Sequence, residues 1–134
     1  DYAAAKGIKT SLENHGFYMQ ESWRVERLIQ AVAHRNFGLT IDLGNFLCVN
    51  ENPTDATGRL AKYVIMAHAK DFHVKPKKAM PPAGWFATPT NICLRGAVAG
   101  HTRSRLRRTR RRSDLVRKLW IRRAGDPTAW RPGP

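Results

Sequence analysis

Three short apolar segments recur along the first part of the chain and predict β-strands. Gly7–Leu12 alternates in part between polar and apolar residues, whereas Phe37–Ile41 and Tyr63–Ala67 are apolar along most of their length. Each segment ends where polar residues begin. Strands as apolar as the second and third leave no face suited to water, so we expect a sheet that other elements cover.

Helical periodicity lies between the first two strands. From Val25 to Val32, apolar residues recur at i, i+3, i+4 and i+7, which is the spacing of one helix face. Ser22 is the expected N-cap, and residues 36–38 (NFG) are the expected stop. The pattern therefore predicts a helix over about residues 22–36.

A second, shorter helix is predicted from Pro53, with Thr54 as its cap and Asp55 favoured by the helix dipole. The elements then alternate strand, helix, strand, helix, strand. This order predicts an α/β fold in which right-handed crossovers link the strands of a parallel sheet. The segment 75–90, which is rich in Pro and Lys, predicts an exposed loop.

Positive charge is concentrated near the end of the sequence. The chain has 134 residues and a formal net charge of +14, of which residues 1–100 carry +4 and residues 101–134 carry +10. We therefore divide it into a folded part, 1–100, and an Arg-rich tail, 101–134. No apolar run reaches the roughly 18 residues of a membrane span. Cys48 and Cys93 match no metal or redox spacing, which favours reduced thiols in a cytoplasmic protein.

Candidate chemistry lies where the three strands end. Glu13, Asp42 and His68 stand at these ends, 29 and 26 residues apart. Because the carboxyl ends of parallel strands meet at one edge of a sheet, the three side chains are expected to converge. Two carboxylates and an imidazole suit a divalent metal such as Mn²⁺, Mg²⁺, Co²⁺ or Zn²⁺. The alternative is that each residue is simply the polar group with which the chain leaves the core.

Three motifs carry a resemblance to a known family. In this order, residues 12–16 (LENHG), 41–46 (IDLGNF) and 68–72 (HAKDF) resemble motifs of the xylose isomerase-like TIM barrel family, the sugar phosphate isomerases and epimerases. The resemblance covers about residues 5–100 and implies part of a (β/α)₈ barrel, about strands five to seven. A complete barrel needs about 250 residues. We therefore expect a fragment from the C-terminal half of such an enzyme.

The resemblance also implies a reaction. It assigns Glu13, Asp42 and His68 as ligands of one divalent metal, and Glu13 as one member of an acid/base pair. The implied substrate is a small sugar or sugar phosphate, whose oxygens the metal holds while it stabilises an enediolate and a carboxylate moves the proton. Members carry a second Glu on the last strand, but this chain has no Glu after Glu51. We therefore expect this chain alone not to catalyse isomerisation or epimerisation.

Four further residues are expected to bind substrate: His15, Asn45, Lys70 and Asp71. Many members have His where Asn45 stands, and Asn cannot shuttle a proton at neutral pH, which leaves the substrate open. His15 is equally well explained as an exposed turn residue, and Lys70 and Asp71 as an ion pair at the strand end. Residues 94–101 resemble the approach to the seventh helix of the family.

The tail, residues 101–134, lies outside the resemblance and has two explanations. An Arg-rich arm of this kind binds nucleic acid by neutralising phosphates. We favour an out-of-frame reading of a GC-rich gene, because the segment lacks a docking motif and interleaved aromatic residues. Two other functions stay open: a metal phosphodiesterase of the endonuclease IV type, which shares the barrel, and a nucleic-acid-binding module that uses the tail.

Overall fold

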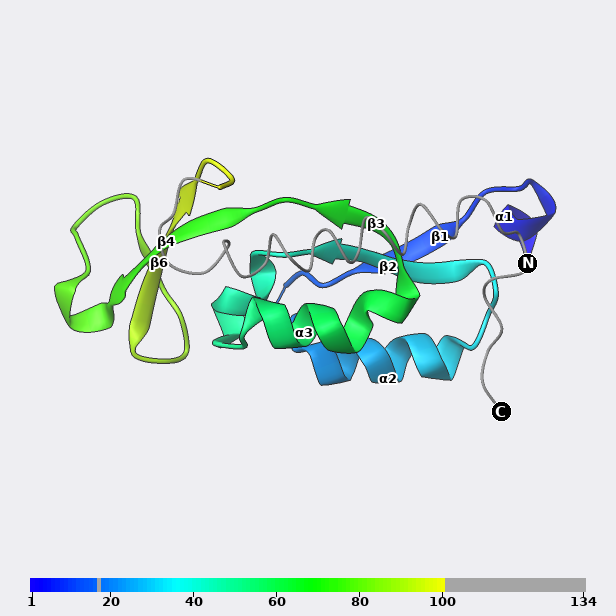
Figure 1. Cartoon of the computed structure of the whole chain (residues 1–134), viewed down its shortest axis with the longest axis horizontal. Helices are drawn as coiled ribbons and strands as arrows, with labels where there is room; N and C mark the ends of the chain where they lie inside the picture. The colour runs from blue at the N-terminus through cyan, green and yellow to red at the C-terminus, as the bar shows by residue number, and fades with distance from the viewer. Residues whose placement is uncertain (17, 101–134) are drawn as a thin grey trace.

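The computed structural model describes residues 1–16 and 18–100, and its centre is a three-stranded parallel sheet (Figure 1). The strands lie in chain order, with β2 between β1 and β3. Thr10 pairs with Phe37 at one end of the sheet, and Asp42 pairs with His68 at the other. The predicted parallel α/β sheet is therefore confirmed. The strand bounds are β1 (Thr10–Glu13), β2 (Phe37–Asp42) and β3 (Val64–His68).

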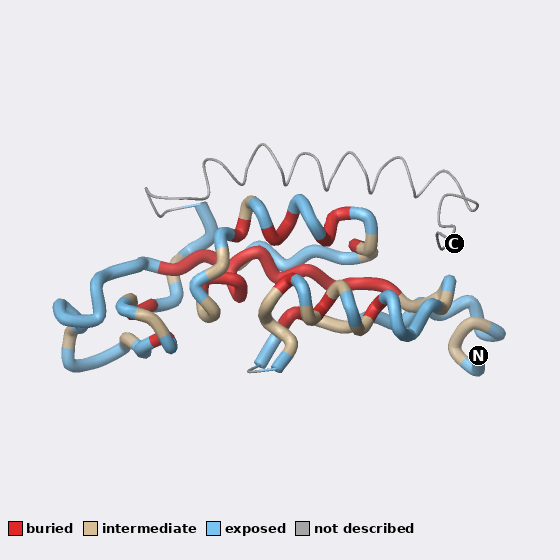
Figure 2. Tube along the Cα trace, turned by 90° about the horizontal axis from the view of Figure 1, so that it is seen from below, coloured by how far each residue is buried: buried red, intermediate tan, exposed pale blue. Residues whose placement is uncertain are grey.

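Helices α2 (Ser22–Val32) and α3 (Pro53–Leu60) connect these strands and cover the same face of the sheet (Figure 1). Leu39 and Ile41 of β2 point into the core between this face and the helices. Figure 2 shows a continuous run of buried residues, which corresponds to β2, and buried residues that recur along the helices. The remaining buried members of this cluster are Val25, Ile29, Leu43, Phe46, Ala56, Leu60 and Val64.

The first predicted helix is shorter than its pattern indicated, and its predicted cap is wrong. Glu21 is the N-cap, and Ser22 is the first helical residue. The carboxylate of Glu51 accepts hydrogen bonds from the backbone N–H of Ser22, at 2.8 Å, and from its hydroxyl. A carboxylate is favourable at the positive end of a helix dipole. The helix ends at Val32 because Ala33 adopts the left-handed conformation, with φ 45°.

The second predicted helix is present, but Asn52, not Thr54, caps it. The side-chain oxygen of Asn52 accepts a hydrogen bond from the backbone N–H of Thr54 at 3.0 Å. Pro53 takes the first helical position, where its missing N–H costs nothing. Short helices complete this part of the chain: α1 (Tyr2–Ala5) and the 3₁₀ helices η1 (Asn45–Val49) and η2 (Ala61–Tyr63).

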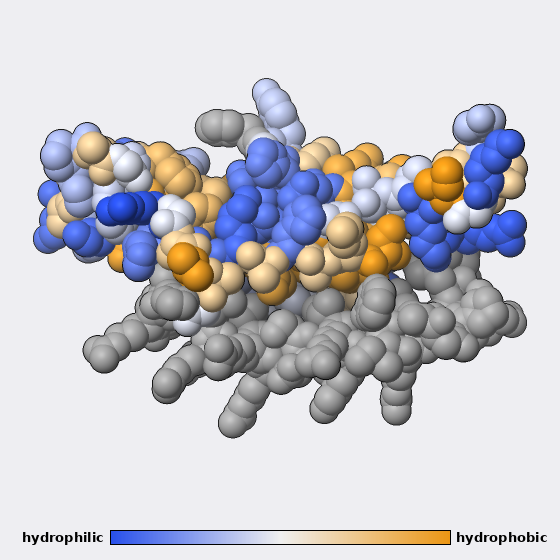
Figure 3. All heavy atoms as spheres, turned by 90° about the horizontal axis from the view of Figure 1, so that it is seen from above, coloured by the Kyte–Doolittle hydropathy of each residue, from blue (hydrophilic) through white to orange (hydrophobic). Residues whose placement is uncertain are grey.

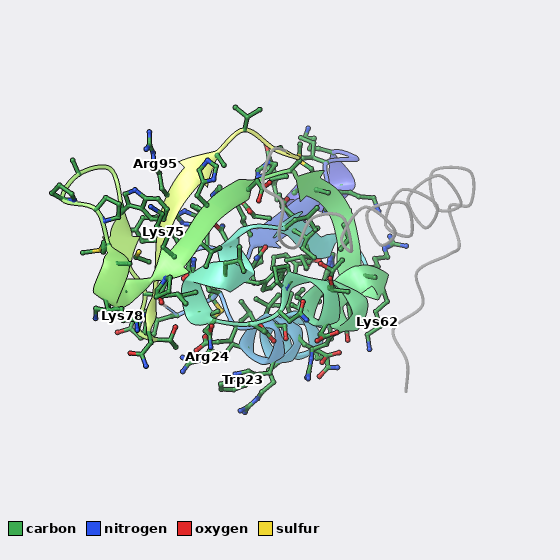
Figure 4. The ribbon with its side chains drawn as sticks, turned by 60° about the vertical axis from the view of Figure 1, so that its left-hand side comes forward. Trp23, Arg24, Lys62, Lys75, Lys78 and Arg95 are labelled. Carbon is green, nitrogen blue, oxygen red and sulfur yellow. The ribbon has the colours of Figure 1, made fainter. Side chains whose placement is uncertain are left out.

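The segment predicted as an exposed loop, residues 75–90, is exposed over most of its length, but it also contributes the end of β4 and the whole of β5 to a second, antiparallel sheet. Its strands lie in the order β4–β6–β5, and Figure 4 shows Lys75, Lys78 and Arg95 in this region. Residues 94–97, part of the segment predicted to approach the seventh helix, belong to β6, and whatever follows residue 100 lies outside the described residues. Leu47, Phe72 and Leu94 form a small core beneath this sheet. The bounds are β4 (Asp71–Pro76), β5 (Phe86–Ala87) and β6 (Ile92–Ala97), with the 3₁₀ helix η3 at Lys77–Ala79.

The described helices are all too short or too polar to cross a membrane. The Arg-rich tail, residues 101–134, lies outside the described residues. Both explanations of the tail, as a nucleic-acid-binding arm and as an out-of-frame segment, therefore remain predictions from the sequence.

Candidate metal centre

The parallel sheet brings Glu13, Asp42 and His68 together at the carboxyl ends of its strands. Each offers a donor atom, and these donor atoms all lie within 4.8 Å of one another. His68 Nδ1 is 3.1 Å from Glu13 Oε1, so these two side chains already contact each other. Figure 3 shows a hydrophilic patch on the face turned away from the helices, over the region where β3 passes into β4.

Asp42 is the most enclosed member of the cluster, with 1% of its side chain exposed. Its Oδ1 accepts backbone hydrogen bonds from Gly44 at 2.9 Å and from Asn45 at 3.2 Å. Its Oδ2 lies 2.9 Å from the ammonium nitrogen of Lys70. A buried carboxylate is costly unless it is paired and hydrogen-bonded, and both oxygens of Asp42 meet that condition.

Asn14, which directly follows β1, holds Asp42 in place by hydrogen bonds, a role that the sequence did not reveal. Its Nδ2 donates to the carbonyl of Asp42 at 2.9 Å, and its Oδ1 accepts from the N–H of Asp42 at 2.7 Å. Asn14 is completely buried. The paired bonds fix the end of β2 to the turn after β1, so the backbone that carries the Asp42 carboxylate has little freedom to move.

Asn45 and Lys70 complete this network. The side chain of Asn45 is buried; its Nδ2 donates to the carbonyl of Asn14 at 3.0 Å, and its Oδ1 accepts from Lys70 at 2.9 Å. Lys70 therefore bridges Asn45 and Asp42. Asn45 and Lys70, which the sequence predicted to bind substrate, therefore both lie in the hydrogen-bond network around Asp42.

The close approach of Lys70 depends on the glycine that follows β2. A Cβ added at Gly44 would lie 2.8 Å from the carbonyl oxygen of Lys70 and 3.0 Å from its Cβ and Cγ. These separations are shorter than van der Waals contact, so a larger residue at position 44 would push the Lys70 segment away from Asp42.

The two other predicted substrate residues lie in different surroundings. His15 is exposed in the turn after β1. Asp71 is buried, and its carboxylate accepts backbone hydrogen bonds from Phe72 at 2.8 Å and Gly100 at 3.2 Å. Asp71 thus helps to anchor the start of β4 and the end of the described chain.

A pocket of about 470 Å³ lies between the start of α2, η1 and β5. Cys48 is one of its lining residues, and burial raises the pKa of the Cys48 thiol. A hydrogen bond with Gln20 and the charge of Lys70 act in the opposite direction. Sequence reasoning gave no sign of this pocket, because its walls come from segments far apart in the chain. Its lining residues are Tyr18, Gln20, Glu21, Arg24, Cys48, Val49, Phe86, Ala87, Thr88 and Pro89.

The three clustered side chains fit a divalent cation in their chemistry. Two carboxylates and an imidazole are the ligands that Mn²⁺, Co²⁺ and Zn²⁺ accept, and Mg²⁺ accepts the carboxylates. Glu13 is 36% and His68 45% exposed, so an ion can reach both from solvent. Asp42 adds a rigid ligand from the buried side. Three protein ligands would leave coordination positions for substrate oxygens.

The three parallel strands, with helices on one face and a polar centre at their carboxyl ends, have the arrangement of one wall of a β/α barrel. The sequence model of one family, described as xylose isomerase-like TIM barrel, matches residues 1–101. The chain belongs to this family, as its motifs predicted. No curated protein matches the sequence.

Proposed function

We propose that the cluster is the metal site of a sugar or sugar phosphate isomerase or epimerase. The observation that carries this proposal is the convergence of Glu13, Asp42 and His68, whose donor atoms lie within 4.8 Å of one another at the carboxyl ends of adjacent strands. Family membership supports the same reaction class. A small sugar is the partner that such a centre would take, since vicinal carbonyl and hydroxyl oxygens suit a hard cation.

The exposure and hydrogen bonding of Glu13 and Asp42 suit them to different roles. Glu13 is the most suitable base because it is partly exposed, and its Oε1 contacts the His68 imidazole, which restrains the carboxylate. Asp42 is held by Gly44, Asn45 and Lys70 and therefore serves as a ligand, not as a proton carrier. A bound divalent cation would polarise the substrate carbonyl and so acidify the neighbouring C–H.

Proton exchange with solvent is the sharpest test, because it needs one base and no second glutamate. The full chain is incubated in D₂O with Mn²⁺ and a panel of ketoses and ketose phosphates, and deuterium beside the carbonyl is measured by mass spectrometry. We expect metal-dependent incorporation without epimerised product. General-base catalysis of this kind typically contributes about 10²–10⁴-fold, so Glu13→Gln should reduce exchange to near background.

Two matched variants complete the design. Asp42→Asn is expected to abolish the metal dependence, whereas Asp55→Asn, which removes an exposed carboxylate on α3, should leave exchange unchanged. If exchange with the wild-type chain is no faster than with Mn²⁺ alone, the proposed activity of this chain is wrong. If Glu13→Gln retains full exchange, the assignment of the base is wrong.

A phosphodiesterase of the endonuclease IV type is the second candidate within the same barrel class. Such a site needs additional His and Glu ligands for several metals. Among the described residues, a single cluster of three potential ligands is found, which favours a one-metal centre. Cleavage of DNA at an abasic site by the full chain with Zn²⁺ or Mn²⁺ would favour the phosphodiesterase, and the exchange assay would then be negative.

We also propose a cytoplasmic location. Cys48 and Cys93 are both free thiols, and free thiols are typical of reducing compartments. Mass spectrometry after alkylation of the protein purified from its own cells would test this, since two alkylated cysteines are expected.

A further inference from the structure

Lys70 forms an ion pair with Asp42, the most buried carboxylate of the candidate metal centre. Its ammonium nitrogen lies 2.9 Å from Asp42 Oδ2, the one carboxylate oxygen that does not accept a hydrogen bond from the adjacent backbone. We propose that Lys70 is a built-in counter-cation that neutralises Asp42 and competes with a divalent metal for Oδ2. This inference rests on the proposed metal site.

Lys70 is held in place by the fold and is not simply a surface lysine that happens to meet an acid. Its ammonium also donates to Asn45 Oδ1 at 2.9 Å, and Asn45 is buried and bonded to the carbonyl of Asn14. The absence of a side chain at Gly44 lets the Lys70 segment come this close. A surface pair such as Lys62 with Glu26, at 3.2 Å, has a lysine side chain that is 59% exposed, whereas that of Lys70 is 38% exposed.

Competition follows from the shared oxygen. Asp42 Oδ1 already accepts two backbone hydrogen bonds, which leaves Oδ2 as the more available donor for a metal. A divalent ion bound there would lie within a few ångströms of the Lys70 charge, in surroundings where charges are poorly screened. Either the lysine withdraws or the two cations repel. In both cases, removing the lysine charge should tighten metal binding, by about tenfold or more.

The test is the affinity of the full chain for Mn²⁺, measured by the electron paramagnetic resonance signal of the free ion. Lys70→Met removes the charge and keeps most of the length, and Lys70→Gln also keeps a hydrogen-bond donor for Asn45. Both are expected to lower the Mn²⁺ Kd about tenfold. Lys78→Met, which removes an exposed lysine from η3, should change the Kd less than twofold, and Lys70→Arg should resemble the wild type.

The second measurement is the thermal stability of the protein without and with Mn²⁺. In the presence of a chelator, Lys70→Met should unfold at a lower temperature than Lys78→Met, because Asp42 loses its counter-charge, and Mn²⁺ should raise its Tm by more than it raises that of the wild type. Equal or weaker Mn²⁺ binding by both Lys70 variants would overturn the competition while leaving the metal site in place. Absence of Mn²⁺ binding in every variant would overturn the metal site itself and the inference with it.

Discussion

Replacing Gly44 by alanine tests whether the close contact between Gly44, just after β2, and Lys70 contributes to the free energy of unfolding. The added Cβ would meet the carbonyl oxygen of Lys70 at 2.8 Å, and this atom belongs to the backbone and cannot rotate away. Overpacking of this kind typically costs about 1–3 kcal/mol. Gly44 has φ −86° and ψ −29°, so alanine adds no backbone strain and regains about 0.4–1 kcal/mol from the unfolded state. The expected net loss is therefore about 1.3 kcal/mol, the difference between the midpoints of these two ranges.

Thermal and urea unfolding followed by circular dichroism would measure this loss. For a folded part of this size, about 1 kcal/mol corresponds to a change in Tm of roughly 4–8 °C. Gly96→Ala is the matched control, because an added Cβ there meets nothing within 4 Å and the backbone needs no positive φ. The reasoning is refuted if Gly44→Ala is as stable as the wild type, or if Gly96→Ala loses as much stability.

Three further predictions concern other parts of the molecule. Glu51→Gln should destabilise the chain by about 0.5–2 kcal/mol in urea unfolding, because Ser22 loses the charged acceptor that closes the start of α2; no change would show that a neutral amide suffices. Cys48 should react with iodoacetamide more slowly than glutathione at pH 8, and the gap should narrow at higher pH, because burial raises its pKa and so lowers its thiolate fraction; equal rates at pH 8 would contradict this. Thr57→Val should raise the free energy of unfolding by about 1 kcal/mol, because the buried hydroxyl of Thr57 has no hydrogen-bond partner among the described residues. If thermal unfolding shows a loss of stability of similar size, the reason given for this prediction is wrong.

The site cluster followed from the sequence because parallel strands impose its geometry. Glu13, Asp42 and His68 lie one βα unit apart, and such units repeat the same strand end at the same edge of the sheet. Apolar runs marked the strands, and family motifs marked the residues within them. Neither inference required knowledge of side-chain contacts.

The hydrogen-bond network around the cluster could not be predicted from the sequence. Asn14 bonds to the backbone of a strand 28 residues away, and no spacing rule encodes a hydrogen bond between a side chain and a distant backbone group. Asn45 is a predicted substrate residue, and its side chain also bonds to Asn14 and Lys70, partners that are set by the packing of three chain segments. Polar residues at strand ends thus look alike in sequence whether they bind ligand or brace a neighbour.

The second sheet was missed because its composition resembles that of a loop. Residues 75–90 are rich in Pro and Lys, and most are exposed, so no apolar alternation marks the strand residues within this segment. The ladder between β4 and β6 depends on backbone hydrogen bonds, which any non-proline residue can make. In the same way, the early end of α2 depends on Ala33 in a left-handed conformation that alanine rarely adopts.

The open edges of the parallel sheet have a consequence for how this chain behaves at high concentration. Within the described residues, β2 has neighbours on both sides, whereas β1 and β3 each leave one edge without a paired strand. The two edges differ, so joining the β3 edge of one molecule to the β1 edge of the next is a head-to-tail contact. No whole number of three-stranded walls makes an eight-stranded ring. Self-association through these edges would therefore give chains of variable length, not a rebuilt barrel.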